Sequence, residues 1–288
     1  MWEELNKKAL ELFQHGDYSG AQEMSKKALL EAEKSFGPDD PRVARCLNNL
    51  AEMYRVQMNY SEAEPLWERA LELRKNALGK DHPDVATSLN NLAGAYFEQG
   101  KFDKAEPLFL NAIKIFEKAL GPDHVDVAKA LNNLAAVYRS VGKNPGAKAL
   151  YDRALAIQEK ACGPGDPSVG ETLNNLGELL DSLQRYKDAE PLLRRALEIA
   201  EKTFGPDHPN VASSLNNLAG TLVGMKNYNE AESLMMRSKD IIEKSFGAEH
   251  PFVADCLENL ADLCDATDRS ADAKSFRERV EQIRQRGK

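Results

Sequence analysis

The sequence lacks a long hydrophobic run, a signal peptide and a cysteine framework. No segment approaches the roughly 18 consecutive apolar residues that cross a bilayer, and the charged residues 1–18 contain no apolar block of the kind a secretory signal needs. Four cysteines in 288 residues are too few and too widely spaced to hold such a chain together by disulfides. We therefore expect a cytoplasmic protein with no membrane partner.

Basic residues are in the minority, and the motifs of catalysis are missing. The chain has 38 Lys and Arg against 46 Asp and Glu, a formal net charge of −8, and no long basic run. Such a chain is a poor match for nucleic-acid phosphates or anionic lipids. It contains no glycine-rich phosphate loop, no nucleophile elbow and no HExxH pair. We expect no enzyme activity, no cofactor, no metal and no nucleic-acid partner.

What the sequence does contain is a segment of 42 residues that recurs without insertion or deletion. The triplet Leu-Asn-Asn, or Leu-Glu-Asn in the last copy, begins at Leu47, Leu89, Leu131, Leu173, Leu215 and Leu257. A fixed period of this length is typical of a solenoid, whose repeats bury their apolar faces against their neighbours. With a truncated first copy, the sequence predicts one solenoid domain over 1–288, with seven repeats near 1–36, 37–78, 79–120, 121–162, 163–204, 205–246 and 247–288.

Each repeat has the pattern of two amphipathic helices. In the third repeat, a first stripe of apolar residues three and four apart consists of Val85, Leu89, Leu92, Ala93 and Tyr96. Gly100 interrupts the pattern, and a second stripe runs over residues 105–120. Gly121 follows, where a residue in the left-handed conformation can close the last turn. Because no segment alternates with the period of two expected for a half-buried strand, the sequence predicts an all-α fold.

The second repeat carries the small-and-large pattern of a known family. Its segment LNNLAEMYRVQMNYSEAEPLWERAL, aligned on Ala63, Trp67 and Ala70, resembles the tetratricopeptide consensus, whose usual period is about 34 residues. The combination of LNNLA, AEPL, RAL and DHP is similar to the repeats of kinesin light chains and their prokaryotic relatives. The resemblance implies an all-α, right-handed solenoid of seven tetratricopeptide helix pairs. It covers the repeat domain only, because the heptad coiled coil that joins kinesin light chains to the motor has no counterpart here.

Four histidines occupy equivalent loop positions, and we predict that they cap helices. They are His82, His124, His208 and His250. Aspartate fills the same position in two other repeats, and either side chain can accept a backbone N–H at a helix start. Metal ligands would have to converge, which residues spread along a solenoid do not. The four cysteines stand where other repeats have small or apolar residues, so we expect buried, inert thiols at Cys46, Cys162, Cys256 and Cys264.

The second Asn of the triplet recurs on the face of the first helix opposite the apolar stripe. The six residues are Asn49, Asn91, Asn133, Asn175, Asn217 and Asn259. An amide both donates and accepts hydrogen bonds, so it can hold the backbone of an extended peptide whatever its sequence. The resemblance to tetratricopeptide proteins implies this role for all six. The alternative, that each amide pairs with a neighbouring helix, is compatible with it and stays open.

Charged residues on the same face sort by sign along the chain. The first half offers Arg45, Arg55, Phe97, Lys129 and Arg139, and the second half offers mainly acidic residues. Glu52 and Glu98 are exceptions within the first half. Arginine binds carboxylates in two contacts, and a large apolar anchor would provide most of the affinity. The pattern therefore predicts a peptide ligand that is acidic and carries an aromatic or apolar anchor, and kinesin light chains are similar in accepting such peptides.

These features predict a non-catalytic adaptor or scaffold that binds a protein or peptide partner in a groove lined by the first helices. We expect a monomer, with weak self-association as the alternative. Three other functions stay open: a regulatory module that acts in trans on an enzyme or transcription factor and is switched by a peptide, an enzyme of unfamiliar type, and a repeat chain made as a stability scaffold. The irregular surface and the divergent fourth and seventh repeats count against the last.

Overall fold

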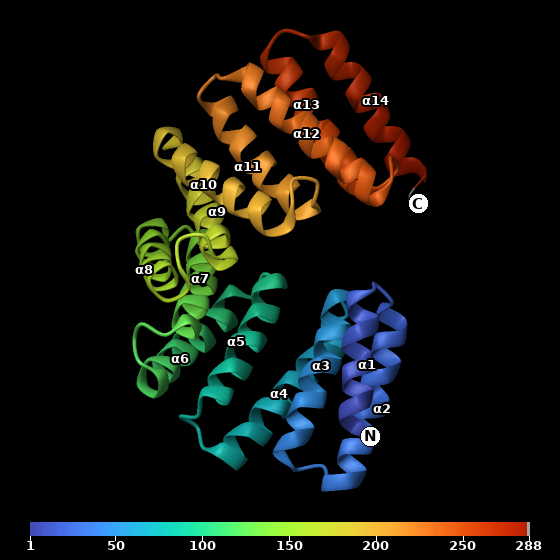
Figure 1. The fold of residues 1–288 in the computed structure, drawn as a ribbon, viewed down its shortest axis with the longest axis vertical. Coiled ribbons are helices and arrows are strands. Elements are labelled where there is room, and N and C mark those ends of the chain that lie inside the picture. The colour runs from blue at the N-terminus through green and yellow to red at the C-terminus, as the bar shows by residue number, and fades with distance from the viewer. Residues whose placement is uncertain (287–288) are drawn as a thin grey trace. The chain divides into compact units, whose positions relative to one another are not determined.

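The computed structural model describes residues 1–286, which form fourteen α-helices and no strand (Figure 1). In chain order the helices are α1 (Trp2–Gln14), α2 (Tyr18–Phe36), α3 (Pro41–Val56), α4 (Tyr60–Leu78), α5 (Pro83–Glu98), α6 (Phe102–Leu120), α7 (Val125–Ser140), α8 (Asn144–Cys162), α9 (Pro167–Ser182), α10 (Tyr186–Phe204), α11 (Pro209–Gly224), α12 (Tyr228–Phe246), α13 (Pro251–Ala266) and α14 (Ser270–Arg286). Each repeat contributes an odd-numbered helix and then an even-numbered one. The predicted all-α class and the seven helix pairs are confirmed.

The chain divides into two compact units, residues 1–150 and residues 151–288. We call them the N-terminal and the C-terminal unit. Within the N-terminal unit, α2, α4 and α6 each pack on the helix before and the helix after them. Within the C-terminal unit, α10 and α12 do the same, and α14 packs on α13. This succession is what stacked repeats require, because each repeat buries its apolar face on the next. That residues 1–288 form a single solenoid domain stays a prediction.

Small residues face large ones in the core of each helix pair. In the second repeat Ala63 and Ala70 are fully buried and Trp67 is 2% exposed. In the fifth repeat the large residue is Leu193, and a Cβ atom added to Gly177 of α9 would lie 2.5 Å from Leu193 Cδ2. Glycine is therefore favoured at position 177, since a side-chain carbon at that distance would overlap a buried methyl group of α10.

The starts of the first helices confirm the predicted capping role of the loop histidines. In each case the imidazole Nδ1 accepts the backbone N–H two residues later, at 3.1–3.3 Å, for His82, His124, His208 and His250. Asp40 and Asp166 make the same contact through Oδ1 at 2.9 Å. Within residues 1–286, no group of three or more His, Cys, Asp or Glu side chains is placed to hold a metal ion.

The glycine after each second helix has a backbone conformation that differs from the prediction. Gly121 has φ 93° and ψ 156°, whereas the left-handed conformation expected there has ψ near +47°. Its N–H still donates to the Glu117 carbonyl at 3.1 Å and closes the last turn of α6. Positive φ with an extended ψ is essentially restricted to glycine, which explains why all six loops of this kind place glycine here, with φ of 85–94°.

Arginines on the second helices clamp a repeat to the one before it. Arg69 of α4 pairs with Glu33 of α2 at 2.6 Å and donates to the Pro38 carbonyl at 2.9 Å. Equivalent pairs of contacts run from Arg195 to Glu159 and Pro164, and from Arg237 to Glu201 and Pro206. The second and third repeats lack this ion pair, because Lys75 stands at the position of Glu33 and Asn111 at the position of Arg69.

Three of the four cysteines are buried, as predicted. They are Cys46, Cys256 and Cys264, and burial raises the pKa of each thiol. Cys162 is exposed, so the prediction for it was wrong. It ends α8 at a position where Leu78 and Phe204, its counterparts in other repeats, are themselves 40% and 42% exposed.

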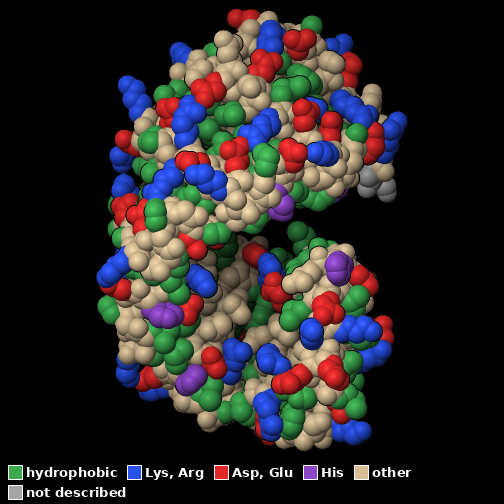
Figure 2. All heavy atoms as spheres, in the orientation of Figure 1, with side chains coloured by type: hydrophobic (Ala, Val, Ile, Leu, Met, Phe, Trp, Pro, Cys, Tyr) green, Lys and Arg blue, Asp and Glu red, His purple; other side chains and the backbone are tan. Residues whose placement is uncertain are grey.

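The surface carries charges of both signs. Figure 2 shows Lys and Arg side chains interspersed with Asp and Glu over the visible face, with hydrophobic side chains scattered between them. Among residues 1–286, no helix has the length and apolar character needed to cross a bilayer.

Candidate functional site

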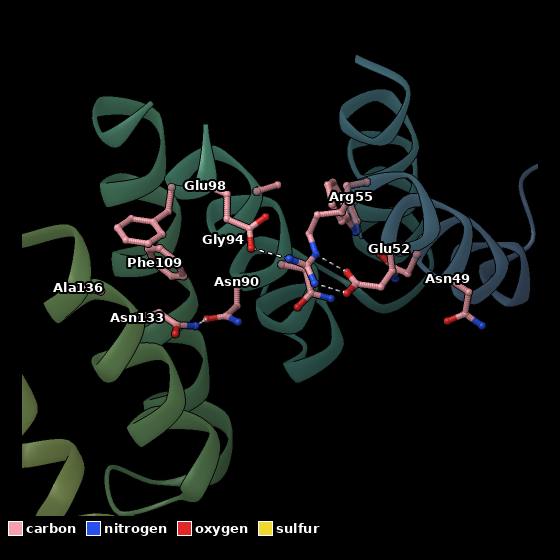
Figure 3. Close-up of a pocket in the computed structure, with 14 residues that line it drawn as sticks. Asn49, Glu52, Arg55, Asn90, Gly94, Glu98, Phe109, Asn133 and Ala136 are labelled. Atoms are coloured by element: carbon pink, nitrogen blue, oxygen red, sulfur yellow. Dashed lines mark hydrogen bonds and ion pairs between the residues drawn. The ribbon is translucent and has the colours of Figure 1, made fainter. Parts of the chain in front are cut away.

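A cavity of about 620 Å³ opens on the face of the N-terminal unit that the first helices form (Figure 3). We call it the groove cavity. Its lining comes from α3 (Asn48, Asn49, Glu52, Arg55), α5 (Asn90, Asn91, Gly94, Ala95, Phe97, Glu98), α7 (Asn133, Ala136), α4 (Trp67) and α6 (Phe109). A volume of this size lies within the range of about 300–1,000 Å³ that is usual for ligand sites.

The groove cavity brings together five of the eleven residues predicted for a peptide site, namely Asn49, Arg55, Asn91, Phe97 and Asn133. They meet because equivalent positions of stacked repeats present the same helix face. The other predicted residues lie outside its lining, with Arg45 on α3, Lys129 and Arg139 on α7, and Asn175, Asn217 and Asn259 on α9, α11 and α13 of the C-terminal unit. A role in ligand binding stays a prediction for all eleven.

Arg55 is held by two carboxylates within the groove cavity. Its Nε and Nη2 donate to Glu52 at 2.9 and 2.5 Å, and its Nη1 donates to Glu98 at 2.5 Å (Figure 3). The hydrogen bonds to Glu52, together with the charge of both carboxylates, raise the pKa of the Arg55 guanidinium above its usual range. The three groups carry a net charge of −1, and the contact with Glu98 ties α3 to α5. The sequence identified both glutamates as exceptions but could not show that they hold this arginine.

Two of the other predicted cations also have acidic partners. Arg45 pairs with Glu3 at 3.6 Å and lies over the ring of Trp2, 4.6 Å from its centroid. Lys129 pairs with Asp126 at 3.6 Å. Exposed pairs of this kind are weak, about 0–1 kcal/mol each, but they place a negative charge next to each positive one. The positive field that the sequence pattern suggested is therefore reduced locally.

The asparagines of the triplets form hydrogen bonds between first helices. Asn49 donates from Nδ2 to Asn6 Oδ1 at 3.1 Å. Asn133 donates from Nδ2 to Asn90 Oδ1 at 3.2 Å, as Figure 3 shows. In the C-terminal unit, Asn217 donates to a glutamate of the preceding first helix at 2.7 Å. Pairing with a neighbouring helix, one of the two roles left open above, is thus present at three positions. Each amide keeps a second N–H and its carbonyl oxygen for another partner.

Two side-chain amides in the groove cavity have hydrogen-bonding groups without a partner among residues 1–286. The side chain of Asn91 is exposed and makes no hydrogen bond to another residue within 1–286, and Asn48 Oδ1 is buried with no donor among these residues. Asn48 and Asn90, the first asparagines of their triplets, were missed as lining residues by the sequence analysis. The signal was available, because they recur with the same 42-residue step, but only the positions opposite the apolar stripe were considered as lining residues.

Comparison with known proteins gives a consistent family match. A sequence model of the tetratricopeptide repeat matches residues 47–118, 84–160, 126–202, 168–238 and 211–286, and a second model of the same repeat matches residues 6–77. No curated protein matches the chain.

Solved structures of similar fold include proteins from bacteria and a fungus. The quorum sensor NprR from B. thuringiensis, in its apo form, has a TM-score of 0.72 and 17% identity over 97% of this chain and 75% of its own. BtubC (BKLC) from P. vanneervenii has a TM-score of 0.67 and 22% identity over 77% of this chain and 89% of its own. A Podosopora anserina structure, described as kinesin light chain with nearly identical TPR-like repeats, has a TM-score of 0.60 and 26% identity over 71% of this chain and 97% of its own.

Proposed function

Since the chain belongs to the tetratricopeptide repeat family, we propose that it is a non-catalytic adaptor that binds an extended segment of a partner protein in the groove cavity. The observation that carries the proposal is the row of amides that three consecutive first helices, α3, α5 and α7, place along this cavity: Asn49, Asn91 and Asn133. Amides suit a peptide backbone, which alternates donors and acceptors whatever the side chains are. A ligand whose backbone is bound in this way must be extended, so that its N–H and C=O groups are free to pair.

An apolar side chain of the ligand would anchor it beside Phe97. Gly94 leaves open space above α5, since a Cβ atom there would meet nothing within 4 Å. Trp67 and Phe109 line the same cavity from the second helices. Burial of an aromatic or branched side chain in this space supplies about 25 cal/mol for each Å² of apolar surface removed from water, and a single well-buried anchor commonly dominates the affinity of a peptide.

A carboxylate on the ligand would bind Arg55 in exchange for Glu98. Glu52 holds the guanidinium from the same helix in two contacts, whereas Glu98 makes one contact and comes from α5. Since Glu98 is about one-third exposed, it can return to water when the ligand replaces it. We therefore expect Glu98→Gln to strengthen the binding of acidic peptides, and Arg55→Gln to weaken it. If Glu98→Gln leaves the affinity unchanged, the ligand carboxylate does not use this site.

The test of the groove cavity is a selection of displayed random peptides against the purified chain, followed by affinity measurements on the enriched peptides. Gly94→Phe places an aromatic ring in the cavity from a position where the Cβ atom meets nothing within 4 Å, and it should abolish their binding. Gly220→Phe is the matched control, because Gly220 occupies the equivalent position on α11 and is equally open. Enriched peptides that bind Gly94→Phe as tightly as the unchanged chain would overturn the proposal.

A second candidate function is a regulatory module switched by a peptide. The contact between Arg55 and Glu98 joins the first helices of two successive repeats, so a ligand that displaces Glu98 also loosens α3 from α5. The fold similarity to the quorum sensor NprR is consistent with such a role. Small-angle X-ray scattering with and without a selected peptide separates the two functions, since a regulator changes its radius of gyration or oligomeric state on binding and an adaptor keeps both.

A further inference from the structure

Three phenylalanines are exposed where second helices of the C-terminal unit end and the next first helix begins. Phe204, Phe246 and Phe252 are 42%, 45% and 53% exposed. Phe246 stacks on His250 with ring centroids 4.9 Å apart and meets Phe252 edge-on at 5.9 Å. Exposed apolar residues are ordinary when scattered singly, but grouped they mark interaction sites.

Two cavities open beside these rings, one on each side of the N-terminal half of α11. The first has a volume of about 380 Å³ between α9, α10 and α11, with Phe204 in its lining. The second has a volume of about 340 Å³ between α11, α12 and α13, with Phe246 and Phe252 in its lining. Asn210 lines both, so the two cavities are neighbours. We call the three phenylalanines and these two cavities the edge surface.

The needs of the fold do not explain the aromatic residues. At the position of Phe252, other repeats have Arg42, Asp84 and Asp126, so the first turn of the helix forms with a charged residue there. In the N-terminal unit, by contrast, the equivalent ring of Phe36 is covered by other side chains. Phe36 lies under the guanidinium of Arg42, 3.4 Å from the ring centroid, and packs edge-on against Trp2 at 5.9 Å.

Two buried acceptors of the edge surface lack a donor among residues 1–286. Asn174 donates from Nδ2 to Ser214 at 2.9 Å, which leaves its Oδ1 buried in the first cavity without a donor among residues 1–286. Asn216 Oδ1 is in the same state in the second cavity. A buried acceptor without a donor costs free energy, so a ligand that brings N–H groups gains from both.

The charges that border the second cavity are unbalanced. Asp255 lines it, and the cation that Asp255 attracts is Arg284. Arg284 gives its two hydrogen bonds to Glu258 instead, at 2.8 and 2.9 Å. These three groups carry a net charge of −1, on a chain whose net charge is −8. Lys or Arg on a partner would find a carboxylate that shares its nearby cation with Glu258, beside an apolar cavity.

We propose that the edge surface is a second docking site, separate from the groove cavity, for a segment of another protein that carries two bulky apolar side chains and a Lys or Arg. The apolar side chains enter the two cavities on either side of α11, and the cation binds Asp255. Backbone or side-chain N–H groups of the segment reach Asn174 and Asn216. A second copy of this acidic chain fits less well, because its own charge opposes the approach.

The experiment uses the full chain and a displayed library of random peptides, with affinities of the enriched peptides measured by titration. Selection is carried out on the Gly94→Phe variant, which should not bind ligands of the groove cavity. Any enriched peptide therefore reports on another surface, and the two proposed sites are tested independently. We expect peptides with paired apolar residues and a net positive charge. Phe252→Asp should weaken them by about tenfold or more, and Phe204→Leu, which places there the residue found at Leu78, should weaken them independently.

Both substitutions introduce residues that other repeats already carry at these positions, so folding is expected to be kept and is checked by circular dichroism. Asp255→Lys should remove the preference for basic over matched acidic peptides. The proposal is overturned if the enriched peptides are acidic, or if they bind Phe252→Asp and Phe204→Leu as tightly as the parent chain. It is also overturned if the chain self-associates through this surface, seen as a dimer in analytical ultracentrifugation that Phe252→Asp abolishes.

Discussion

Gly94 and Gly177 lie inside first helices, and replacing each by alanine should change stability in opposite directions. In a helix interior, glycine is less favourable than alanine by about 1 kcal/mol, because it loses more backbone freedom on folding. At Gly94 the new methyl group meets nothing within 4 Å. The gain is therefore undiminished, and Gly94→Ala should raise the free energy of unfolding by about 1 kcal/mol.

At Gly177 the same gain is opposed by a clash. The new Cβ would lie 2.5 Å from Leu193 Cδ2 and 2.6 Å from Leu193 Cγ, and Leu193 is fully buried. Forcing an extra carbon into a packed core costs about 1–3 kcal/mol. Subtracting the helix gain of about 1 kcal/mol leaves a loss of about 0–2 kcal/mol for Gly177→Ala. The two variants should thus differ by about 1–3 kcal/mol.

Urea unfolding followed by circular dichroism measures this difference through the midpoints and slopes of the transitions. Leu193→Ala in the Gly177→Ala background removes the γ and δ carbons that clash, so it should cost less there than in the unchanged chain. A Gly177→Ala variant as stable as Gly94→Ala would refute the packing of α9 against α10 described above.

Three further predictions test the helix cap, the clamp and the core. Hydrogen bonds from Arg42 hold the pKa of Asp40 at about 2, below its ordinary 3.8. The stabilisation by these bonds is therefore complete above pH 3.8 and is lost as the pH falls through 2. Asp40→Asn keeps a capping side chain but should have a lower melting temperature than the unchanged chain at neutral pH, and this difference should disappear in acid. The double variant Lys75→Glu/Asn111→Arg should create the arginine–glutamate pair that is missing between the second and third repeats and raise the free energy of unfolding by about 0.2–1 kcal/mol. Asn111→Arg alone should not raise it, because the new arginine would face the positive charge of Lys75. Trp67→Ala should lower the urea midpoint by the equivalent of about 3–5 kcal/mol, and a loss below 1 kcal/mol would contradict the burial of this ring.

Much of the fold could be predicted from the sequence because the pattern is local. The 42-residue step, the apolar stripes and the histidine or aspartate before each first helix determined where helices begin and which side they bury. Exposure at the end of a helix was harder to predict. Cys162 was assigned to the core from its apolar counterparts, yet those counterparts are themselves half-exposed, since the last turn of the second helix extends beyond the packed interface.

The candidate site was predicted in part. Periodicity correctly placed Asn49, Arg55 and Phe97 on one face, because helical residues with equivalent repeat positions point the same way. It did not show that Glu98, on the next first helix, reaches Arg55, nor that the edge surface exists at all. Phe252 attracted no attention in the sequence, because it is a single aromatic residue in the first turn of α13.

By itself, then, the sequence determined the helices, their order and the buried apolar stripe of each one, because these follow from backbone hydrogen bonds and apolar spacing within about 42 residues. Only the tertiary structure decided which charged side chains form ion pairs between repeats. Arg55 and Glu98 are 43 residues apart, and their contact depends on how two repeats stack and on the rotamers of two long side chains. The same holds for the three exposed phenylalanines, since exposure depends on what neighbouring helices leave uncovered.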